Sequence, residues 1–353
     1  MQMVTRPKLD HLRRLTGEHG IIQFSQGDVP DLDSGFCLDD NVRLLTLAVS
    51  LRKEEPHHSF AIEAGNIVFD FIEDSSQEAP LYHNMMDQHG TFTDRFASPE
   101  SIGRLIWSLG IVMRDSRDPR WLARAQREMQ KAMYAVPALS SEHARAFAAL
   151  GWSAAVEAGE VQYRAPLRAV AEAMHFEFER NASAEWQWVL PELTYDKARL
   201  PEALLRAGRV LEDSDIYASG ARALEFLATV VQTDDMFVPV GAPGWYARGG
   251  ERPYYSQQPL EAVAMMDAWL AHGDVDSAFV AYEWYLGRNS DDLVVADVAS
   301  GGCRDAIHAK GQLNPNMGAE STLAYLQAAT TLGQLRVSDT ATGEASAQQT
   351  RIA

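Results

Sequence analysis

The sequence predicts an all-α protein whose helices pair as six hairpins closed into a ring, an (α/α)6 toroid with its long loops at one mouth. Apolar residues recur at helical spacing through most of the 353 residues, and no convincing strand-like alternation interrupts them. The connections between the helical segments alternate between long and short. No linker rich in proline, glycine or serine divides the chain, so we expect one domain over residues 1–335.

The helical segments follow from the apolar periodicity. They lie at residues 7–17, 41–53, 59–74, 100–115, 119–135, 140–157, 160–181, 199–212, 214–232, 257–272, 274–288 and 317–333. In helices that run alternately up and down, connections of one parity lie at the same end, and all the long connections share one parity. An open helical solenoid would give the same alternation, so ring closure is an inference. Residues 336–353 contain few large apolar side chains and predict a disordered tail.

Composition narrows the class of protein. The formal net charge of -18 argues against nucleic acid and anionic membrane surfaces, which require basic patches. No apolar run is long enough to span a bilayer, and the first residues do not resemble a signal peptide. Two cysteines, Cys37 and Cys303, fit free thiols in a reducing compartment. We therefore expect a cytoplasmic protein without membrane insertion.

A polar cluster, Asp39-Asp40-Asn41, stands between the first long loop and the apolar run at 44–51. One such side chain can cap a helix N-terminus, where unpaired N–H groups and the positive dipole end favour an acid or an amide. The sequence supplies three in a row. Asp40 or Asp39 is therefore a candidate catalytic carboxylate, and a cap with solvated neighbours is the alternative.

The second long loop offers charge and histidine. His83 and His89 flank Asp87, but no third ligand follows at a helical or hairpin spacing, so we expect no metal and no cofactor. Arg104 follows Gly103 one turn into the next helix and is a candidate for the mouth. A plain surface arginine is the alternative.

The loop at 182–198 is dense in aromatic and acidic residues, namely Trp186, Trp188, Glu192, Tyr195 and Asp196. Aromatic faces stack on the apolar faces of sugar rings, while carboxylates bind hydroxyls or transfer protons. The loop therefore indicates a carbohydrate site. The alternative is that the tryptophans fill the core of the ring.

The loop at 233–256 ends in Trp245-Tyr246 and, at the next helix start, Gln257-Gln258 ahead of Pro259. Glutamines beside aromatic residues are good readers of hydroxyl pairs. They also suit a helix start, where proline favours the first turn.

The last long loop places Asn316 and Glu320 among small residues at a helix start. Small neighbours leave space over a carboxylate, as an acid that binds substrate requires. A capping-box glutamate is the alternative.

Together these segments resemble, over residues 7–330, a bacterial carbohydrate-active domain that occurs alone or fused to glycosyltransferase modules and is related in fold to the six-hairpin glycosidases. The matching segments are Gly35-Phe36-Cys37, Asp39-Asp40-Asn41 with Arg43, Gly103-Arg104 with Trp107, Tyr195-Asp196 with Ala198-Arg199-Leu200-Pro201, Gly244-Trp245-Tyr246, Gln257-Gln258-Pro259 with Glu261-Ala262, and Asn316 with Gly318-Ala319-Glu320-Ser321-Thr322-Leu323. The sequence departs from that domain at Phe36, Leu38, Val42 and Lys197, where Tyr, Thr, Ala and Asn are usual.

From the residues and this resemblance we expect an inverting glycoside hydrolase that acts on an oligo- or polysaccharide. The catalytic pair is Asp40 or Asp39 with Glu192 or Glu320. The substrate-binding residues are expected to be Arg43, Arg104, Trp188, Tyr195, Asp196, Trp245, Tyr246, Gln257, Gln258 and Asn316.

Three alternatives stay open: a non-catalytic glycan-binding partner of a glycosyltransferase, a glycoside phosphorylase, and a sugar epimerase. An epimerase on this fold needs histidines as acid and base, and the sequence does not gather His83, His89 and His175 at one mouth.

Overall fold

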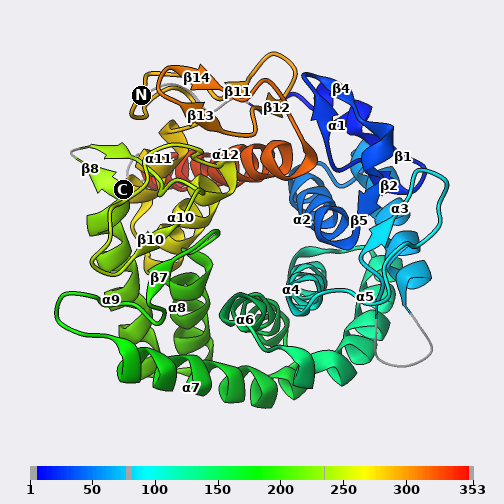
Figure 1. The fold of residues 1–353 in the computed structure, drawn as a ribbon. Helices are drawn as coiled ribbons and strands as arrows, with labels where there is room; N and C mark the ends of the chain where they lie inside the picture. The colour runs from blue at the N-terminus through cyan, green and yellow to red at the C-terminus, as the bar shows by residue number, and fades with distance from the viewer. Residues whose placement is uncertain (1–5, 77–81, 234, 350–353) are drawn as a thin grey trace.

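The computed structural model describes residues 6–76, 82–233 and 235–349, and within these ranges it contains twelve α-helices arranged as two concentric rings (Figure 1). The inner helices are α2 (Leu38–Glu54), α4 (Pro99–Asp115), α6 (Glu142–Glu157), α8 (Arg199–Leu211), α10 (Pro259–His272) and α12 (Ala319–Gln349). The outer helices are α1 (Asp10–Leu15), α3 (Ser59–Ser75), α5 (Pro119–Ala132), α7 (Arg164–Asn181), α9 (Ser214–Val231) and α11 (Val275–Glu283). Short 3-10 turns occur at Leu32–Ser34, Met133–Ala138 and Val161–Tyr163.

The inner ring is closed. Each inner helix packs against the next along the chain, and α12 packs back against α2. At this seam Gln334 Nε2 donates to the carbonyl of Ser50 over 2.9 Å. The predicted (α/α)6 toroid is therefore confirmed, and the open solenoid is excluded because a solenoid leaves its first and last repeats apart.

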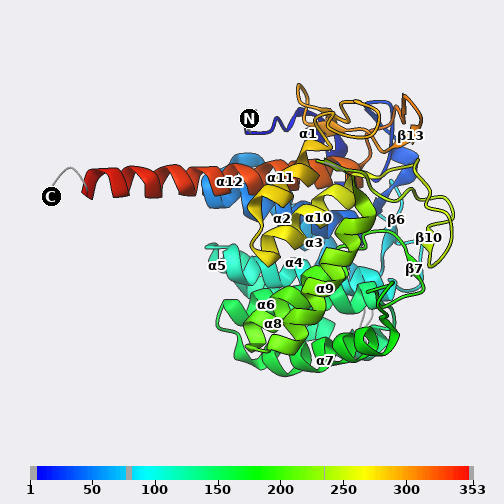
Figure 2. The same cartoon turned by 90° about the vertical axis from the view of Figure 1, so that its left-hand side faces the viewer.

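The long loops all lie on one side of the ring, at the N-terminal ends of the inner helices. Figure 2 shows β6, β7, β10 and β13 on this side, while the end of α12 projects on the opposite side. The short connections within each hairpin lie opposite the loops, as the alternation of lengths predicts. We call the loop side the mouth and the other side the rear.

The start of α2 differs from the prediction. The N-cap is Cys37, whose Sγ accepts from the backbone N–H of Asp40 over 3.4 Å, and not Asp39, Asp40 or Asn41. All three polar residues therefore lie inside the first turns of the helix. Asn41 serves the fold, because its side chain accepts from the N–H of Ile21 and donates to the carbonyl of Cys37.

Helices α4 and α6 approach closely because glycine lines their contact. A Cβ atom at Gly151 would lie 2.2 Å from the carbonyl oxygen of Ile106, and one at Gly110 would lie 2.0 Å from that of Gly151. No side chain larger than hydrogen fits there without separating the helices. This contact brings the N-terminal turns of the two helices together at the mouth.

Short strands decorate the mouth loops, although the sequence predicts none. Within the described ranges they form seven two-stranded antiparallel ladders. The pairs are β1 (Thr16–Gly17) with β2 (Gly20–Ile21), β3 (Ser25–Gln26) with β4 (Val29–Pro30), β5 (Phe36–Cys37) with β6 (Met85–Met86), β7 (Glu192–Leu193) with β10 (Tyr246–Ala247), β8 (Gln232–Thr233) with β9 (Met236–Phe237), β11 (Ala296–Asp297) with β12 (Gly302–Cys303), and β13 (Ile307–Ala309) with β14 (Gln312–Leu313). Strands of two or three residues are too short to show a period of two, so the pattern could not reveal them.

The core lies between the two rings of helices, where apolar side chains such as Trp121, Trp152 and Trp284 are almost fully buried. Cys37 and Cys303 are buried and free, as expected. Helix α12 continues to Gln349, whereas the composition of residues 336–353 predicts disorder. No helix of the described ranges has the length and apolarity that crossing a bilayer requires.

Candidate active site

A cavity of about 420 Å³ opens at the mouth, and we call it the mouth cavity. The first turns of α2, α4, α10 and α12 and the loops between them line it. The lining side chains that carry charge are Asp39, Asp40, Arg43, Glu100, Arg104, Asp305 and Glu320. Asp39, Asp40, Glu100 and Glu320 belong to first turns, where the positive end of the helix dipole favours negative charge.

Asp40 lies at the bottom of the mouth cavity, with only 7% of its surface exposed. Its Oδ2 accepts from the thiol of Cys37 over 3.3 Å, and its Oδ1 accepts from Arg43 Nη1 over 2.8 Å. Burial raises the pKa of this carboxyl from 3.8 to about 6, against the opposing effect of Arg43, and the nearby charge of Glu320 adds to the rise. Asp40 therefore holds its proton at a higher pH than an ordinary aspartate does.

Arg43 joins α2 to α12 across the floor of the cavity. Its Nη1 contacts Asp40, and its Nη2 donates to Glu320 Oε2 over 2.7 Å. The Glu320 side chain is 40% exposed, so it is far better hydrated than Asp40. Two carboxyl groups in different surroundings thus share one guanidinium.

Arg104 is the second buried cation of the floor. Its Nη2 donates to Asp196 Oδ2 over 2.9 Å, its Nε lies 3.6 Å from Asp39 Oδ1, and its guanidinium lies over the ring of Phe147. Asp39 in turn accepts from the hydroxyl of Ser101 over 2.9 Å. The predicted mouth position of Arg104 agrees with this geometry, since a surface arginine would be exposed.

Asp196 lies just beneath the cavity in a left-handed conformation (φ 45°). Although burial opposes ionisation, Arg104 and then Arg199 hold the pKa of Asp196 below its usual range. The neighbouring Lys197 is buried, and its Nζ lies 2.6 Å from Glu261 Oε2. The lysine that departs from the related domain is thus neutralised by an acid of α10 and does not compete for Asp196.

The structure brings seven of the predicted site residues to the mouth cavity. They are Asp39, Asp40, Arg43, Arg104, Tyr195, Gln258 and Glu320. They come from four helix starts and one loop that are far apart in the sequence. This convergence is the geometry that the prediction required.

Two predicted binding residues are contradicted. Trp188 is 1% exposed and packs in the core, so its face cannot stack on a ligand at the mouth. Gln257 is fully buried, donates to Tyr254 O and Ser290 Oγ, and accepts from the indole of Trp284. Its side chain therefore holds the loop and has no group left for a substrate.

Four further candidates lie outside the mouth cavity. Glu192 is exposed on β7, and Tyr246 lies on the paired strand β10 with its ring against Trp186. Trp245 is half-buried, with its ring near Tyr195 and over the Lys197 ammonium. Asn316 accepts from the N–H of Gly27 and so joins two mouth loops.

Three further residues that line the cavity, Phe24, Glu100 and Asp305, are not among the predicted site residues. Phe24 is 61% exposed at the rim. Glu100 accepts from the hydroxyls of Ser141 and Tyr195, and Asp305 accepts from the N–H of Gly318 over 2.8 Å. The alternation of long and short loops could have indicated Glu100. This residue directly follows Pro99, where α4 begins, and the long loop before α4 places that helix start on the mouth side.

No histidine lines the mouth cavity within the part of the chain that the structure describes. His83 contacts Asp94 and stacks on Phe92, His89 is exposed, and His175 contacts Ser219 on the outer ring.

The fold and this cavity define the class of protein: an (α/α)6 toroid with a carboxylate-lined mouth. No family model matches the sequence, and no curated protein matches it. Solved structures do. The chain is similar to a sugar epimerase from a ruminal bacterium, with a TM-score of 0.66 and 14% identity over 92% of this chain and 95% of that one. It is also similar to the cellobiose 2-epimerase of Bacillus thermoamylovorans (TM-score 0.65, 12% identity, 91% and 96% covered).

A third similar structure is the GH76 α-mannanase of Bacteroides thetaiotaomicron, with a TM-score of 0.62 and 10% identity over 92% of this chain and 95% of that one. At these identities the likeness establishes the toroid fold that epimerases and a glycosidase share.

Proposed function

We propose that this protein is a glycoside hydrolase that cleaves an oligo- or polysaccharide in the mouth cavity. The observation that carries the proposal is Asp40, a buried carboxyl with a pKa of about 6, which faces the better hydrated Glu320 across Arg43. Glycosidases use two carboxyl groups that differ in protonation, one to donate a proton and one to activate water or attack the sugar.

Asp40 is the proton donor in this proposal. A general acid works best when its pKa lies near the working pH, and burial gives Asp40 that property. The protonated carboxyl transfers its proton to the glycosidic oxygen as the bond to the anomeric carbon breaks. The thiol of Cys37 and the guanidinium of Arg43 hold its two oxygens in place.

Glu320 is the base, because it is hydrated and paired with a cation. Both carboxylates contact terminal nitrogens of one planar guanidinium, so their oxygens lie within about 8 Å of each other. Separations of roughly 6.5–9.5 Å suit inversion and roughly 5–5.5 Å suit retention. We keep inversion as the prediction, with Asp39 as the alternative acid and Glu192 as the alternative base.

The remaining lining residues suit a sugar. Phe24 offers an exposed aromatic face at the rim, and Gln258 offers an amide. Arg104 is available to bind hydroxyls from the floor. Charges of both signs line the cavity, which favours a neutral glycan over a polyanion.

The test is a screen of the purified protein against α- and β-linked oligosaccharides, with release of reducing ends as the readout and NMR for the anomer formed first. On a substrate that the native protein cleaves, Asp40→Asn and Glu320→Gln should each lower kcat by at least about 100-fold. Glu192→Gln tests the alternative base and should stay within about twofold of the native rate if Glu320 is the base, since Glu192 lies outside the cavity. Full activity in Asp40→Asn overturns the assignment.

A sugar epimerase or isomerase is the second candidate, since the similar structures include a sugar epimerase, a D-mannose isomerase and a cellobiose 2-epimerase. Removal of a proton next to a carbonyl needs a base that titrates near neutrality, commonly histidine. No histidine lines the cavity within the described residues, so Asp40 would have to act as that base. The two reactions are separable, because epimerisation changes the sugar without releasing a new reducing end. A phosphorylase would require inorganic phosphate in the same screen.

We also keep a glycan-binding partner of a glycosyltransferase as an alternative without catalysis. Such a protein binds glycans in the mouth cavity and releases no reducing ends. In Glu320→Gln its affinity for the glycan should fall only by the contribution of one contact. The two buried free thiols support a cytoplasmic setting for either role.

A further inference from the structure

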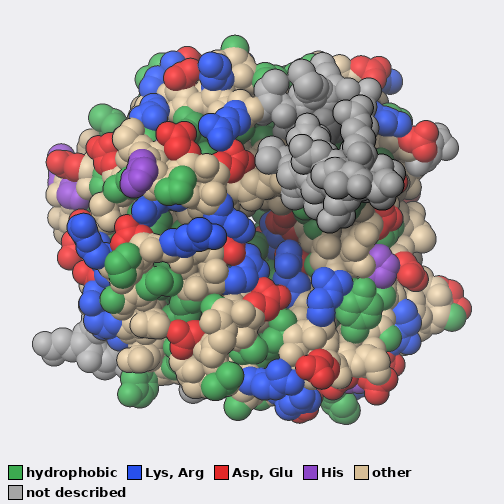
Figure 3. Space-filling view, turned by 180° about the vertical axis from the view of Figure 1, so that it is seen from behind, with side chains coloured by type: hydrophobic (Ala, Val, Ile, Leu, Met, Phe, Trp, Pro, Cys, Tyr) green, Lys and Arg blue, Asp and Glu red, His purple; other side chains and the backbone are tan. Residues whose placement is uncertain are grey.

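A second cavity, of about 220 Å³, lies behind the floor of the mouth cavity, and we call it the rear chamber. All six inner helices line it. Seen from behind, the molecule is hollowed near its centre, with lysine and arginine side chains around the hollow (Figure 3). Arg43, Arg104 and Glu320 line both cavities, so the ion-paired floor is the wall between them.

We propose that the rear chamber is a second ligand site, which takes one small, neutral, polyhydroxylated molecule of monosaccharide size. Its volume has room for several water molecules or for one pyranose ring with its hydroxyls. Asp40, Tyr195 and Gln258 do not line it, whereas Glu320 lies in the wall that the two cavities share.

The charges of the rear chamber are neutralised within its own wall. Lys53 Nζ lies 3.3 Å from Asp115, Arg206 contacts Glu202 over 2.8 Å, and Arg199 contacts Asp267 over 2.8 Å. Each cation therefore already has an anionic partner. An ionic ligand would have to break these pairs, whereas a neutral ligand adds hydrogen bonds to them.

One side of the chamber, formed by α2 and α12, carries neutral hydrogen-bonding groups. Ser50, Gln327, Thr331 and Gln334 all line it. Gln327 Nε2 donates to Ser50 Oγ and Thr331 Oγ1, each over 3.3 Å. Its Oε1 is buried and accepts no hydrogen bond within the described structure. An unsatisfied buried acceptor is costly, and a ligand hydroxyl would satisfy it.

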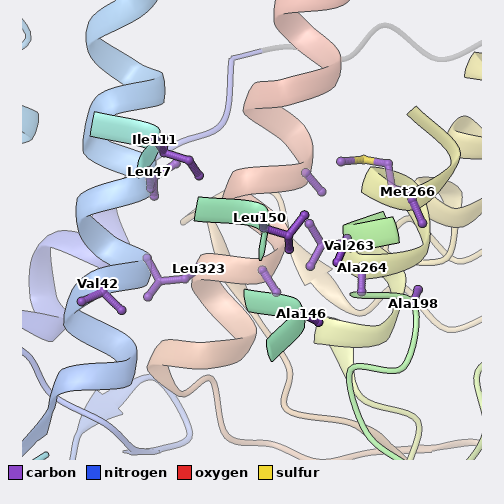
Figure 4. Packing of buried hydrophobic residues seen from close by; sticks show 14 of the residues in the cluster. Val42, Leu47, Ile111, Ala146, Leu150, Ala198, Val263, Ala264, Met266 and Leu323 are labelled. Carbon is purple, nitrogen blue, oxygen red and sulfur yellow. The ribbon is translucent and has the colours of Figure 1, made fainter. Parts of the chain in front are cut away.

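Aliphatic side chains lie among the charged pairs around the chamber. Val42, Leu150, Val263 and Leu323 line the chamber, and Figure 4 shows them between α2, α6, α10 and α12. A sugar ring presents C–H groups on its faces and hydroxyls around its edge. The aliphatic side chains suit the C–H faces of such a ring, and the amides and hydroxyls suit its hydroxyl edge.

The shared wall links the two sites. A molecule in the rear chamber contacts Arg43, Arg104 or Glu320 from behind, so it changes the surroundings of the same pair that faces the mouth. If a ligand in the rear chamber changes the affinity of the mouth cavity for its ligand, the mouth ligand changes the affinity of the rear chamber by the same factor.

The test measures binding of D-glucose, D-mannose and N-acetyl-D-glucosamine to the whole protein by calorimetry, with D-glucose 6-phosphate as the charged comparison. The variants are Gln327→Leu, which removes the free acceptor, and Thr331→Trp, which fills the half-buried rim. Gln258→Leu is the matched control, because it makes the same chemical change in the mouth cavity. Near-ultraviolet circular dichroism checks that each variant is folded. If Thr331→Trp does not fold, the result for Gln327→Leu alone decides the test.

At least one neutral monosaccharide should saturate a site in the millimolar range. Its affinity should fall about tenfold in Gln327→Leu, vanish in Thr331→Trp, and stay within about twofold in Gln258→Leu. Binding that survives both rear variants, binding that only Gln258→Leu removes, tighter binding of the phosphate ester, or no saturable binding at all would each overturn the proposal. Since the readout is equilibrium binding, a protein without hydrolase activity still gives a decisive result.

Discussion

Replacing Asp40 with asparagine should abolish turnover and at the same time stabilise the protein at neutral pH. The carboxyl has a folded-state pKa of about 6 against an ordinary value of 3.8. The folded state therefore binds more protons than the unfolded state between these values, and stability falls as the pH rises through that window. Asparagine keeps the shape and an oxygen that can accept from Arg43, but it has no proton to lose.

The magnitude follows from the shift. A difference between 3.8 and about 6 corresponds to about 3 kcal/mol between the two states. Relative to the native protein, Asp40→Asn should gain about 2–3 kcal/mol of unfolding free energy between about pH 4 and about pH 8. The assay is urea denaturation of both proteins at several pH values, with their difference plotted against pH, so that groups common to both cancel.

Asp87→Asn provides a control of opposite sign. Asp87 accepts from the N–H groups of His89 and Thr91, and these bonds lower its pKa. Its contribution to stability is present above about pH 4 and is lost as the pH falls below the ordinary value of 3.8, so this variant should lose stability at about pH 5 relative to about pH 2. A difference curve for Asp40→Asn that is flat, or that slopes in the same direction as that of Asp87→Asn, would refute the reasoning and remove the basis for the proton donor.

Four further variants test other parts of the structure. Arg104→Lys should cost about 1–3 kcal/mol in denaturation, because one ammonium cannot bridge both carboxylate partners; an unchanged midpoint would contradict the bridge. Gly151→Ala should lower stability by about 1–3 kcal/mol, since its Cβ meets a backbone carbonyl of α4 at 2.2 Å, and a neutral thermal melt would disprove the close contact. Trp188→Ala should cost about 3–5 kcal/mol and leave the KM of the folded enzyme unchanged; a selective rise in KM would restore its predicted binding role. Phe24→Ala should raise KM about threefold to tenfold without loss of stability, and unchanged kinetics would remove it from the site.

The helical part of the fold was accessible from sequence because it depends on a repeated signal. The apolar spacing located each helix, and the alternation of loop lengths placed the mouth. The two-residue ladders were not accessible, since β5 and β6 pair residues about fifty positions apart and neither has a pattern of its own. Closure of the ring depends on contacts between α2 and α12 that no local pattern encodes.

The site residues could be predicted from the sequence where a polar side chain has no evident role in the local structure, as with Asp40 and Arg104. It was not accessible where a side chain suits two purposes equally. Trp188 has the composition expected of a sugar platform, yet an indole also fills a core, and only its position decides. Gln257 suits a hydroxyl reader, yet its amide is fully used by three neighbours. Phe24 could not be predicted as a site residue, because a single exposed aromatic residue in a loop has no distinguishing neighbours in the sequence.

The seam between α2 and α12 has a kinetic consequence. The contact between Arg43 and Glu320 joins residues 277 positions apart. Contacts of such long range are slow to form, because the chain entropy lost in closing so large a loop is repaid only at the end of folding. Hairpins in between can fold early, but the candidate acid and base meet only when the circle is complete. During refolding, helix content should therefore recover before function does.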